Sequence, residues 1–397
     1  MNKKKIGIVI VLVFVLAAGS IYFSFSNEET QNDEKQVEIS QEEDMYCSIF
    51  GASYMEDGIL YVDGDEYGSL IRFCDNSSGL DGVICMDKTC EHSTRMDSTC
   101  SAHISGGNCG LAVRGEWLYF FSMDEEKEGV CYIYRSDLDG KNREKLYQVE
   151  DVDLLMDVIY HKNLIFYSYC KFDANDDERR VVRICKYDME TKEEELIYEL
   201  DSTQVMIQGM TLKENVIYLS VVYSDATKEE VLKHKFDENF EKKHQQCKII
   251  GIDFESREEL FMVNGTASNR VLSVVQNKLL CKSYDGMDIY CYDVDTMKKE
   301  IFKNRNYIPI QSDSNVYAYF LEYKEKNGKE NYIYYQYNPK ENEWKTLGES
   351  STYYYSLTNG NAYGEIGNGE EAEKVRLSEK EFLQGTLKNE SKYERIN

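Results

Sequence analysis

A short turn signature, repeated along the chain, constrains the fold more than any other feature of the sequence. Each copy begins with an Asp or Asn that follows an apolar run and precedes small or polar residues. Such a side chain can accept hydrogen bonds from the amides of its own turn, which favours it where a chain reverses. The six clear copies are Asp75-Asn-Ser-Ser, Asp137-Leu-Asp-Gly, Asp188-Met-Glu-Thr, Asp253-Phe-Glu-Ser, Asp293-Val-Asp-Thr and Asn338-Pro-Lys-Glu, and Ser378-Glu-Lys-Glu is interpreted as a degenerate seventh.

The signatures lie within a repeating set of short apolar runs. The stretch from Val271 to Lys303 shows the set best, with VLSVV, KLLCKSY, DIYCYDV and KKEIFK separated by polar residues. Runs of this length and pattern predict strands, so the unit is four strands joined by three turns. Neighbouring signatures lie between 40 residues (Asp253 to Asp293) and 65 residues (Asp188 to Asp253) apart. These spacings bracket the blade lengths of β-propellers.

The repeated units predict an all-β fold, a β-propeller of six to seven four-stranded blades, with seven favoured. One four-stranded sheet cannot bury both of its faces, whereas sheets stacked around an axis can. The composition suits strands, because 13% of the residues are aromatic, 32 are Tyr and only 2 are Pro. A pair of packed sheets or an irregular β-solenoid is the alternative. The charged stretch from Ser224 to Gln246 is expected to be an insertion between two strands.

The series of units resembles a known family of repeats. An LYF-like strand at Leu118, the run IYRSDLDGKN from Ile133 and a KLY-like strand at Lys145 are similar to the TolB-like propeller repeats of uncharacterised exported proteins of Gram-positive bacteria. The resemblance covers Met45 to the C-terminus, and the segment from Ser351 departs from it. It implies a propeller with a binding or scaffolding role, and no particular substrate.

Residues 1–26 are interpreted as an N-terminal membrane anchor or signal segment. Three lysines at positions 3–5 precede Ile6 to Phe25, which carries no charged side chain and as a helix would span about 30 Å of bilayer. Lysines before this segment and acidic residues after it predict a single-pass protein of the cell membrane, with a cytoplasmic N-terminus and an extracellular propeller. Cleavage as a signal peptide is the alternative. Residues 27–44 are expected to be an acidic disordered linker to the propeller domain, residues 45–397.

A cysteine- and histidine-rich insertion is expected at residues 85–109, between the first two signatures. Thiolates and imidazoles close together in one chain are the donors that Zn(II) takes in tetrahedral sites, so zinc is the expected metal. Disulfides are the interpretation that the extracellular location and the spacing favour over a metal, and free thiols are the third. The other cysteines lie mostly in strand runs and are expected to pack in the core. The candidate ligands are Cys85, Cys90, His92, Cys100, His103 and Cys109.

Charge limits the classes of partner. The formal net charge is -26, which disfavours nucleic acid, because binding to phosphates requires Lys and Arg. The sequence indicates a membrane-tethered extracytoplasmic propeller for binding, sensing or scaffolding, with a peptide, glycan or protein ligand on the propeller face. The alternative is a propeller-type enzyme that cleaves carbohydrates or peptides with dispersed carboxylates, which would leave no sequence motif.

Overall fold

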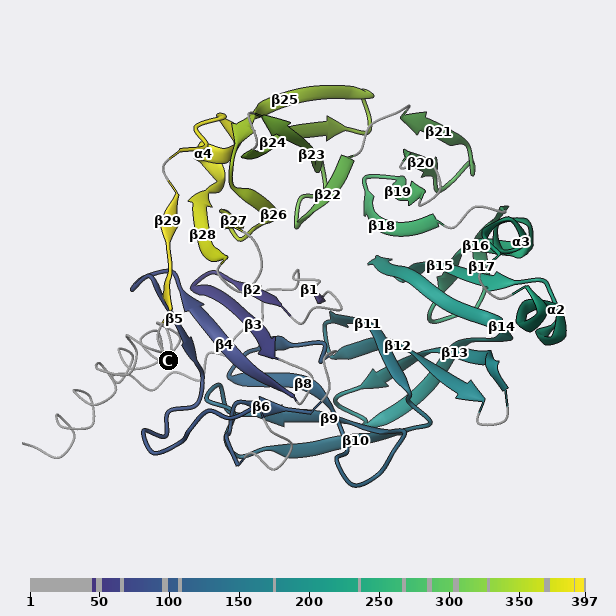
Figure 1. The fold of residues 1–397 in the computed structure, drawn as a ribbon, viewed down its shortest axis with the longest axis horizontal. Coiled ribbons are helices and arrows are strands. Elements are labelled where there is room, and N and C mark those ends of the chain that lie inside the picture. The colour runs from purple at the N-terminus through teal and green to yellow at the C-terminus, as the bar shows by residue number, and fades with distance from the viewer. Residues whose placement is uncertain are drawn as a thin grey trace, which may run out of the picture. The chain divides into compact units, whose positions relative to one another are not determined.

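The computed structural model describes residues 45–47, 52–64, 68–94, 99–105, 109–173, 176–234, 237–265, 269–283, 288–302, 307–326, 329–367, 372–388 and 390–395. The expected membrane anchor and the acidic linker lie outside these residues. Within the described part of the chain, no helix combines the length and the apolar character needed to cross a bilayer. Strands make up most of the described chain, as the repeats predict (Figure 1).

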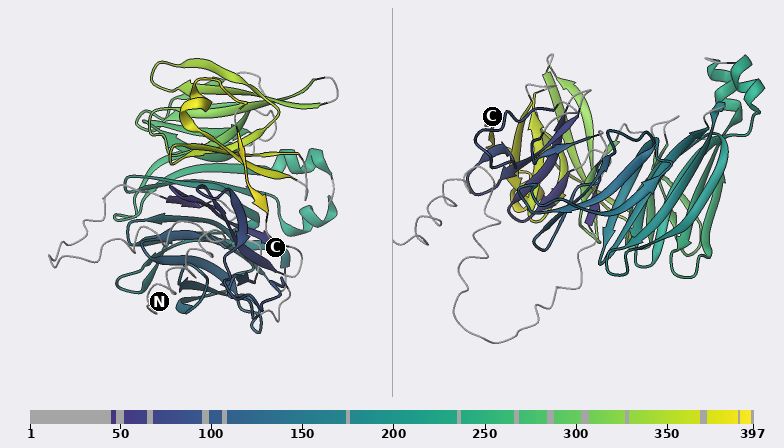
Figure 2. Two further views of the ribbon diagram at one scale, coloured as in Figure 1. Left: turned by 90° about the vertical axis from the view of Figure 1, so that its left-hand side faces the viewer. Right: turned by 90° about the horizontal axis from the view of Figure 1, so that it is seen from below.

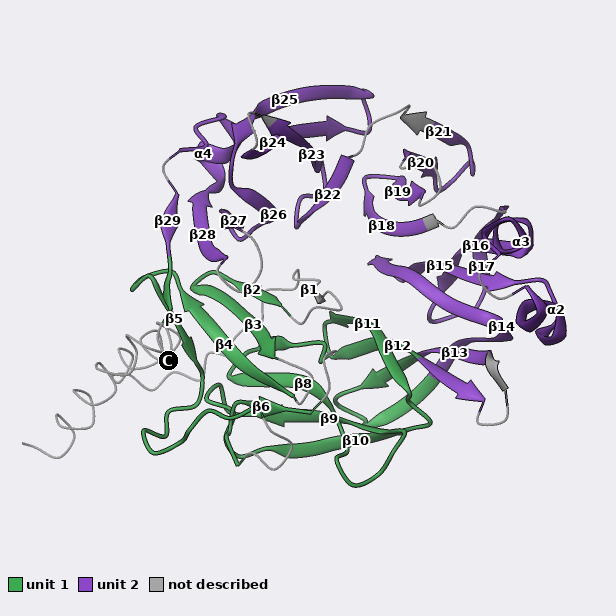
Figure 3. Cartoon of the chain, in the orientation of Figure 1, with its two compact units in different colours: residues 1–169, 185–195, 393–397 green, residues 170–184, 196–392 purple. Residues whose placement is uncertain are grey.

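The chain forms two compact units (Figure 3). Unit 1 comprises residues up to 169, residues 185–195 and residues from 393 onward, and unit 2 comprises residues 170–184 and 196–392. Three strands continue from one unit into the other, because the boundaries fall within β12 (Leu164–Asp173), β13 (Asp176–Asp188) and β14 (Glu193–Lys213).

Unit 1 contains the sheet that carries the first signature. Four of its strands follow one another as antiparallel hairpins, β30 adds to the edge of β5 in parallel, and β6 pairs with β4. The strands are β2 (Ser53–Met55), β3 (Gly58–Gly64), β4 (Ser69–Asp75), β5 (Leu80–Val83), β6 (His103–Ile104) and β30 (Glu394–Arg395).

A second sheet of unit 1 is four-stranded and antiparallel, as expected for the unit around the LYF-like strand. Its order is β10 (Glu144–Glu150), β9 (Val130–Ser136), β8 (Trp117–Met123) and β7 (Ala112–Arg114). Buried side chains of this sheet and of the first sheet form one hydrophobic cluster, which includes Phe73, Ile104 and Phe120. Unit 1 also contains β1 (Met45–Cys47), which pairs with β11 (Leu154–His161).

Unit 2 repeats the four-stranded pattern. The predicted unit at Val271 is confirmed strand by strand, as β18 (Asn269–Val275), β19 (Lys278–Ser283), β20 (Ile289–Asp293) and β21 (Lys299–Phe302). β14 pairs with β15 (Val216–Ser224), β15 with β16 (Gln245–Asp253), and β16 with β17 (Glu259–Gly265), all antiparallel. A further sheet of unit 2 has eight strands, β22 (Tyr307–Ser312), β23 (Ala318–Lys326), β24 (Lys329–Asn338), β25 (Glu343–Ser350), β26 (Tyr353–Thr358), β27 (Asn361–Ile366), β28 (Glu373–Ser378) and β29 (Ser391–Lys392).

The turn signatures cap themselves as the sequence predicts. Oδ1 of Asp253 accepts hydrogen bonds from the peptide N–H groups of Glu255 at 3.0 Å and Ser256 at 2.7 Å. Oδ1 of Asn338 accepts one from Lys340 at 3.1 Å. In these turns the first side chain therefore satisfies main-chain donors that the strands leave unpaired. The turn at Asp137 differs, because the peptide N–H of Lys141 donates to Oδ1 of Asp139 instead.

Two sequence expectations differ in detail from the structure. Ser378 begins no turn between strands; it is the N-cap of α4 (Glu379–Leu383), because its hydroxyl accepts the N–H of Glu381. The insertion between β15 and β16 folds into α2 (Lys228–Lys233) and α3 (Glu238–His244). Figure 2 shows these helices beyond the ends of the strands.

Candidate metal centre

The insertion begins where β5 ends, and a tight turn reverses it at once. The carboxylate of Asp87 accepts hydrogen bonds from the peptide N–H and the hydroxyl of Thr89, both at 2.8 Å. The peptide N–H of Cys90 donates to the carbonyl of Asp87 at 3.1 Å. This turn brings Cys90 back toward Cys85, although four residues separate the two cysteines in sequence.

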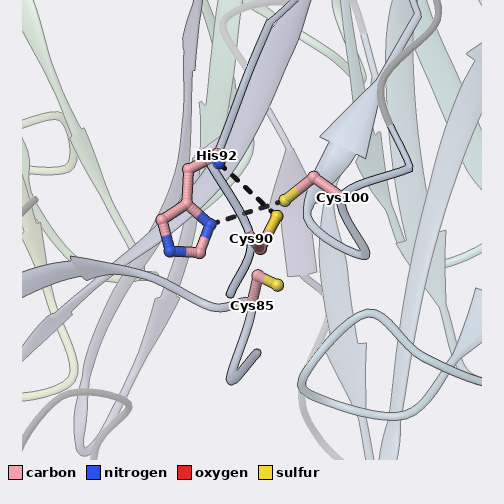
Figure 4. Close-up of side chains that lie close together, drawn as sticks. All are labelled: Cys85, Cys90, His92 and Cys100. Carbon is pink, nitrogen blue, oxygen red and sulfur yellow. Dashed lines mark hydrogen bonds between the residues drawn. The ribbon is translucent and has the colours of Figure 1, made fainter. Parts of the chain in front are cut away.

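Four of the six candidate ligands converge (Figure 4). The donor atoms of Cys85, Cys90, His92 and Cys100 all lie within 4.8 Å of one another. Nδ1 of His92 is 3.7 Å from Sγ of Cys100. Cys85 and Cys100 are buried, whereas Cys90 and His92 are partly exposed. The insertion therefore presents three sulfurs and one imidazole nitrogen to a common point.

The main chain around His92 is shaped for this cluster. Its φ of 50° lies in the left-handed region, which costs a non-glycine residue about 1–2 kcal/mol. In this conformation the peptide N–H of His92 donates to Sγ of Cys90 at 3.4 Å. This hydrogen bond joins the main chain of His92 to the sulfur of Cys90 and so helps to fix two of the four donor residues.

The thiol pKa values differ within the cluster. Burial acts to raise the pKa of Cys85, but hydrogen bonds with Ser101 and with the main chain of Asp87 outweigh it, so the pKa lies below its ordinary value. Burial raises the pKa of Cys100 to about 12. Of these two thiols, that of Cys85 is therefore the more readily ionised.

The donor set fits zinc. Tetrahedral zinc with bonds to sulfur of about 2.3 Å places its sulfurs roughly 3.8 Å apart, which is within the 4.8 Å that bounds the spacing of the donor atoms. Three thiolates and one histidine occupy all four positions of such a site. No position is left for water or substrate, so bound zinc would hold the insertion together and would not act as a Lewis acid on a substrate.

The remaining two candidates lie outside the cluster. His103 is buried in β6, with Nε2 3.2 Å from the carbonyl oxygen of Thr94 and Nδ1 3.9 Å from the carboxylate of Glu125. Cys109 is fully buried in the hydrophobic cluster, and burial raises its pKa to about 12. His103 thus steadies the loop two residues beyond His92, and Cys109 is a core residue.

The cysteines described elsewhere pack in the core as expected. None of the eleven cysteines whose side chains the structure describes forms a disulfide. Cys90 is the only one of these eleven that is not buried. The disulfide interpretation stays a prediction, which chemical analysis of the cluster can test.

A contact that the sequence does not indicate fixes the insertion against the second sheet. The hydroxyl of Ser101 donates to the carbonyl of Asp139 at 2.8 Å, and Nη2 of Arg143 donates to the carbonyl of Ser101 at 2.6 Å. Asp139 and Arg143 belong to the turn between β9 and β10. The only sequence signal at this turn is its signature, which predicts a reversal and no partner.

Comparisons with known proteins support the fold. No protein-family model matches the chain, and no curated protein matches it. The chain is similar to the β-propeller domain of the trilobed protease from Pyrococcus furiosus, with 13% identity over 89% of this chain and 99% of that chain, at a TM-score of 0.53. It is also similar to oligogalacturonate lyase from Vibrio parahaemolyticus, with 13% identity over 70% and 74% of the two chains, at a TM-score of 0.48. The first likeness confirms the predicted β-propeller fold and carries no information about activity.

Proposed function

We propose that this propeller is a non-enzymatic binding or scaffolding protein, tethered outside the cell membrane by its N-terminal segment, with a zinc-held insertion. The number of blades we favour is seven, and the TolB-like repeats of Gram-positive exported proteins are the proposed relatives. The convergence of Cys85, Cys90, His92 and Cys100 within 4.8 Å carries the proposal. A closed four-ligand site gives zinc a structural role, so the function depends on surfaces that the fold presents.

Zinc suits this insertion because the segment cannot stabilise itself by strand pairing. In residues 85–94 and 99–105 the strand content is the two-residue β6. A bound ion that joins four side chains removes much of the conformational freedom of such a loop. We expect zinc to order the segment between the first two sheets of unit 1.

Two of the three buried carboxylates of the described chain have structural roles. Among the described residues these are Asp75, Asp81 and Asp157. Asp75 caps the first signature turn, where Ser77 donates its N–H to Oδ1 at 2.8 Å, and Asp81 pairs with Arg72 at 3.1 Å. Two of the three therefore serve the packing of the first sheet, and a glycosidase needs a pair of carboxylates facing its substrate.

Metal analysis of the purified full-length chain tests the metal centre. We expect one zinc per chain, three thiols that become reactive toward a thiol reagent only after chelation, and a lowered melting temperature of the zinc-free protein. A metal-free protein with a disulfide among Cys85, Cys90 and Cys100 would overturn the zinc proposal and establish a covalent staple.

A reporter fusion tests the location. A reporter placed after Asp44 should be active outside the membrane, since three lysines precede the apolar run. Replacing Leu12 and Val15 with Arg should abolish membrane insertion, because each charge at a helix centre costs about 2.5–3.5 kcal/mol. A reporter active only in the cytoplasm would contradict the assignment.

A further inference from the structure

The last described residues of the chain form a strand on the edge of the first sheet. β30 pairs with β5 in parallel within unit 1, and the peptide N–H of Glu394 donates to the carbonyl of Gly79 at 2.7 Å. Gly79 has a φ of 72° in the first signature turn, and its carbonyl oxygen accepts this hydrogen bond. An open sheet edge can bind any extended segment through main-chain groups, and the side chains then decide which segment fits.

Tyr393 provides the first specific contact. Its side chain is 7% exposed, and its hydroxyl donates to Oδ1 of Asn76 at 2.5 Å. Asn76 is held in place, because its side-chain N–H donates to the carbonyl of Glu56 at 3.0 Å and its peptide N–H donates to Asp57 at 2.8 Å. With its amide nitrogen already used, Asn76 presents a fixed acceptor oxygen to the phenol.

Arg395 provides the second specific contact. Its guanidinium forms an ion pair with the carboxylate of Asp63, and the two side chains are 53% and 40% exposed. An ion pair this exposed adds little affinity, but it selects the sign of the charge. The site is therefore selective for an extended segment in which a tyrosine is followed, two positions later, by a basic residue.

We propose that the edge of β5, together with Asn76 and Asp63, is a peptide-binding site whose partner in trans is the C-terminal segment of a second copy of this chain. The pattern Tyr-x-basic also occurs at Tyr160 and Tyr169, but these tyrosines are buried in β11 and β12, whereas Tyr-x-Arg occurs once, at Tyr393 to Arg395. A second copy is therefore the one partner whose sequence is known to fit. The site uses none of the four donor residues, so it extends the proposed function without depending on it.

Peptide binding to full-length protein tests the site. The Tyr393→Ala protein keeps the site but weakens its own tail, and the probe is a fluorescent peptide of residues 391–397, SKYERIN. We expect this peptide to bind at least tenfold more tightly than the same peptide with alanine in place of tyrosine. A peptide with Arg395→Glu should bind weakly to this protein and regain affinity for the Tyr393→Ala/Asp63→Lys protein. Equal binding of all peptides would overturn the site.

Mixing two full-length variants tests the partner. Tyr393→Ala has an intact site and a weakened tail, whereas Asn76→Ala has an intact tail and a site without its acceptor. Each alone should sediment as a monomer, and the mixture should contain a heterodimer. If Asn76→Ala fails to melt cooperatively, Asp63→Lys replaces it. Peptide binding without a heterodimer would overturn the second copy as the partner. Neither peptide binding nor sedimentation measures the metal content, so failure of the zinc proposal would be seen separately.

Discussion

The main-chain oxygen of Ser101 accepts a hydrogen bond from Nη2 of Arg143 at 2.6 Å, so the residue that follows a candidate zinc ligand is held by the next sheet. The guanidinium of Arg143 also lies 5.0 Å from the ring centroid of Phe120 in β8. Gly140 belongs to the same turn, and a Cβ atom built there would lie 1.9 Å from the carbonyl oxygen of Ser101. The insertion and the β9–β10 turn therefore have to fold together.

Gly140→Ala should destabilise the protein strongly. Its φ of 78° disfavours any side chain, at about 1–2 kcal/mol, and overpacking against Ser101 adds roughly 1–3 kcal/mol. Gly129→Ala is the matched control, because Gly129 has a φ of 73° and nothing within 4 Å of its Cβ position. Urea unfolding measures both. Equal losses would show that the contact with Ser101 is not tight.

Removal of one zinc ligand should release the metal. Cys100→Ser leaves three donors, so we expect zinc content after dialysis to fall to near zero, with a lower melting temperature. Cys109→Ser is the control, since Cys109 is buried outside the cluster, and it should retain one zinc per chain. Zinc loss in both variants would indicate that the effect comes from general unfolding.

Asp81→Asn should cost more stability than Tyr61→Phe. The carboxylate of Asp81 lies 3.1 Å from Nε of Arg72 and 2.7 Å from the hydroxyl of Tyr61, and all three side chains are buried. Asp81→Asn leaves the arginine charge buried without its counter-charge, at about 3–5 kcal/mol. Tyr61→Phe removes one hydrogen bond to a carboxylate that keeps its ion pair, at roughly 1.5–3 kcal/mol. Denaturant unfolding measures the loss of unfolding free energy in both variants. A larger loss in Tyr61→Phe than in Asp81→Asn would contradict the assigned roles.

The carboxyl group of Asp293 should make the free energy of unfolding depend on pH in the acid range. The pKa of the Asp293 carboxyl is lowered to about 2. The largest cause is the pair of hydrogen bonds from the N–H and the hydroxyl of Thr296, and Lys278 has a smaller effect in the same direction. A lowered folded-state pKa stabilises the protein above the unfolded pKa of about 3.9, and this contribution is lost as pH falls from about 4 to 2. Asp293→Asn keeps the cap, as Asn338 does in its own turn. Its unfolding free energy should vary less over this pH range, and an unchanged pH profile would refute the assignment.

The helical insertion should be removable. Ser224 and Gln245 are antiparallel partners at the ends of β15 and β16, so replacing residues 225–244 with Asn-Gly keeps the register. We expect the melting temperature to change by only a few degrees, because Ala226 and Val231 are the only buried apolar side chains of the segment in the described chain. Loss of the cooperative transition would show that α2 and α3 stabilise unit 2.

The sequence was sufficient where structure depends on neighbours in the chain. The four strands around Cys281 follow from local apolar patterns, and the self-capping of Asp253 and Asn338 follows from hydrogen bonds that span two or three residues. The set of candidate metal ligands could also be read from the sequence, because six Cys and His residues fall between positions 85 and 109.

Only the tertiary structure decided which candidates meet. The insertion has no periodic pattern, so its path depends on distant partners, such as Arg143, which holds Ser101 from 42 residues away. That path gathers Cys85, Cys90, His92 and Cys100 and turns His103 and Cys109 elsewhere. The bond between Tyr393 and Asn76 joins residues 317 positions apart. Contacts of this range leave no trace in local composition, because they form only after both segments have been placed by the rest of the fold.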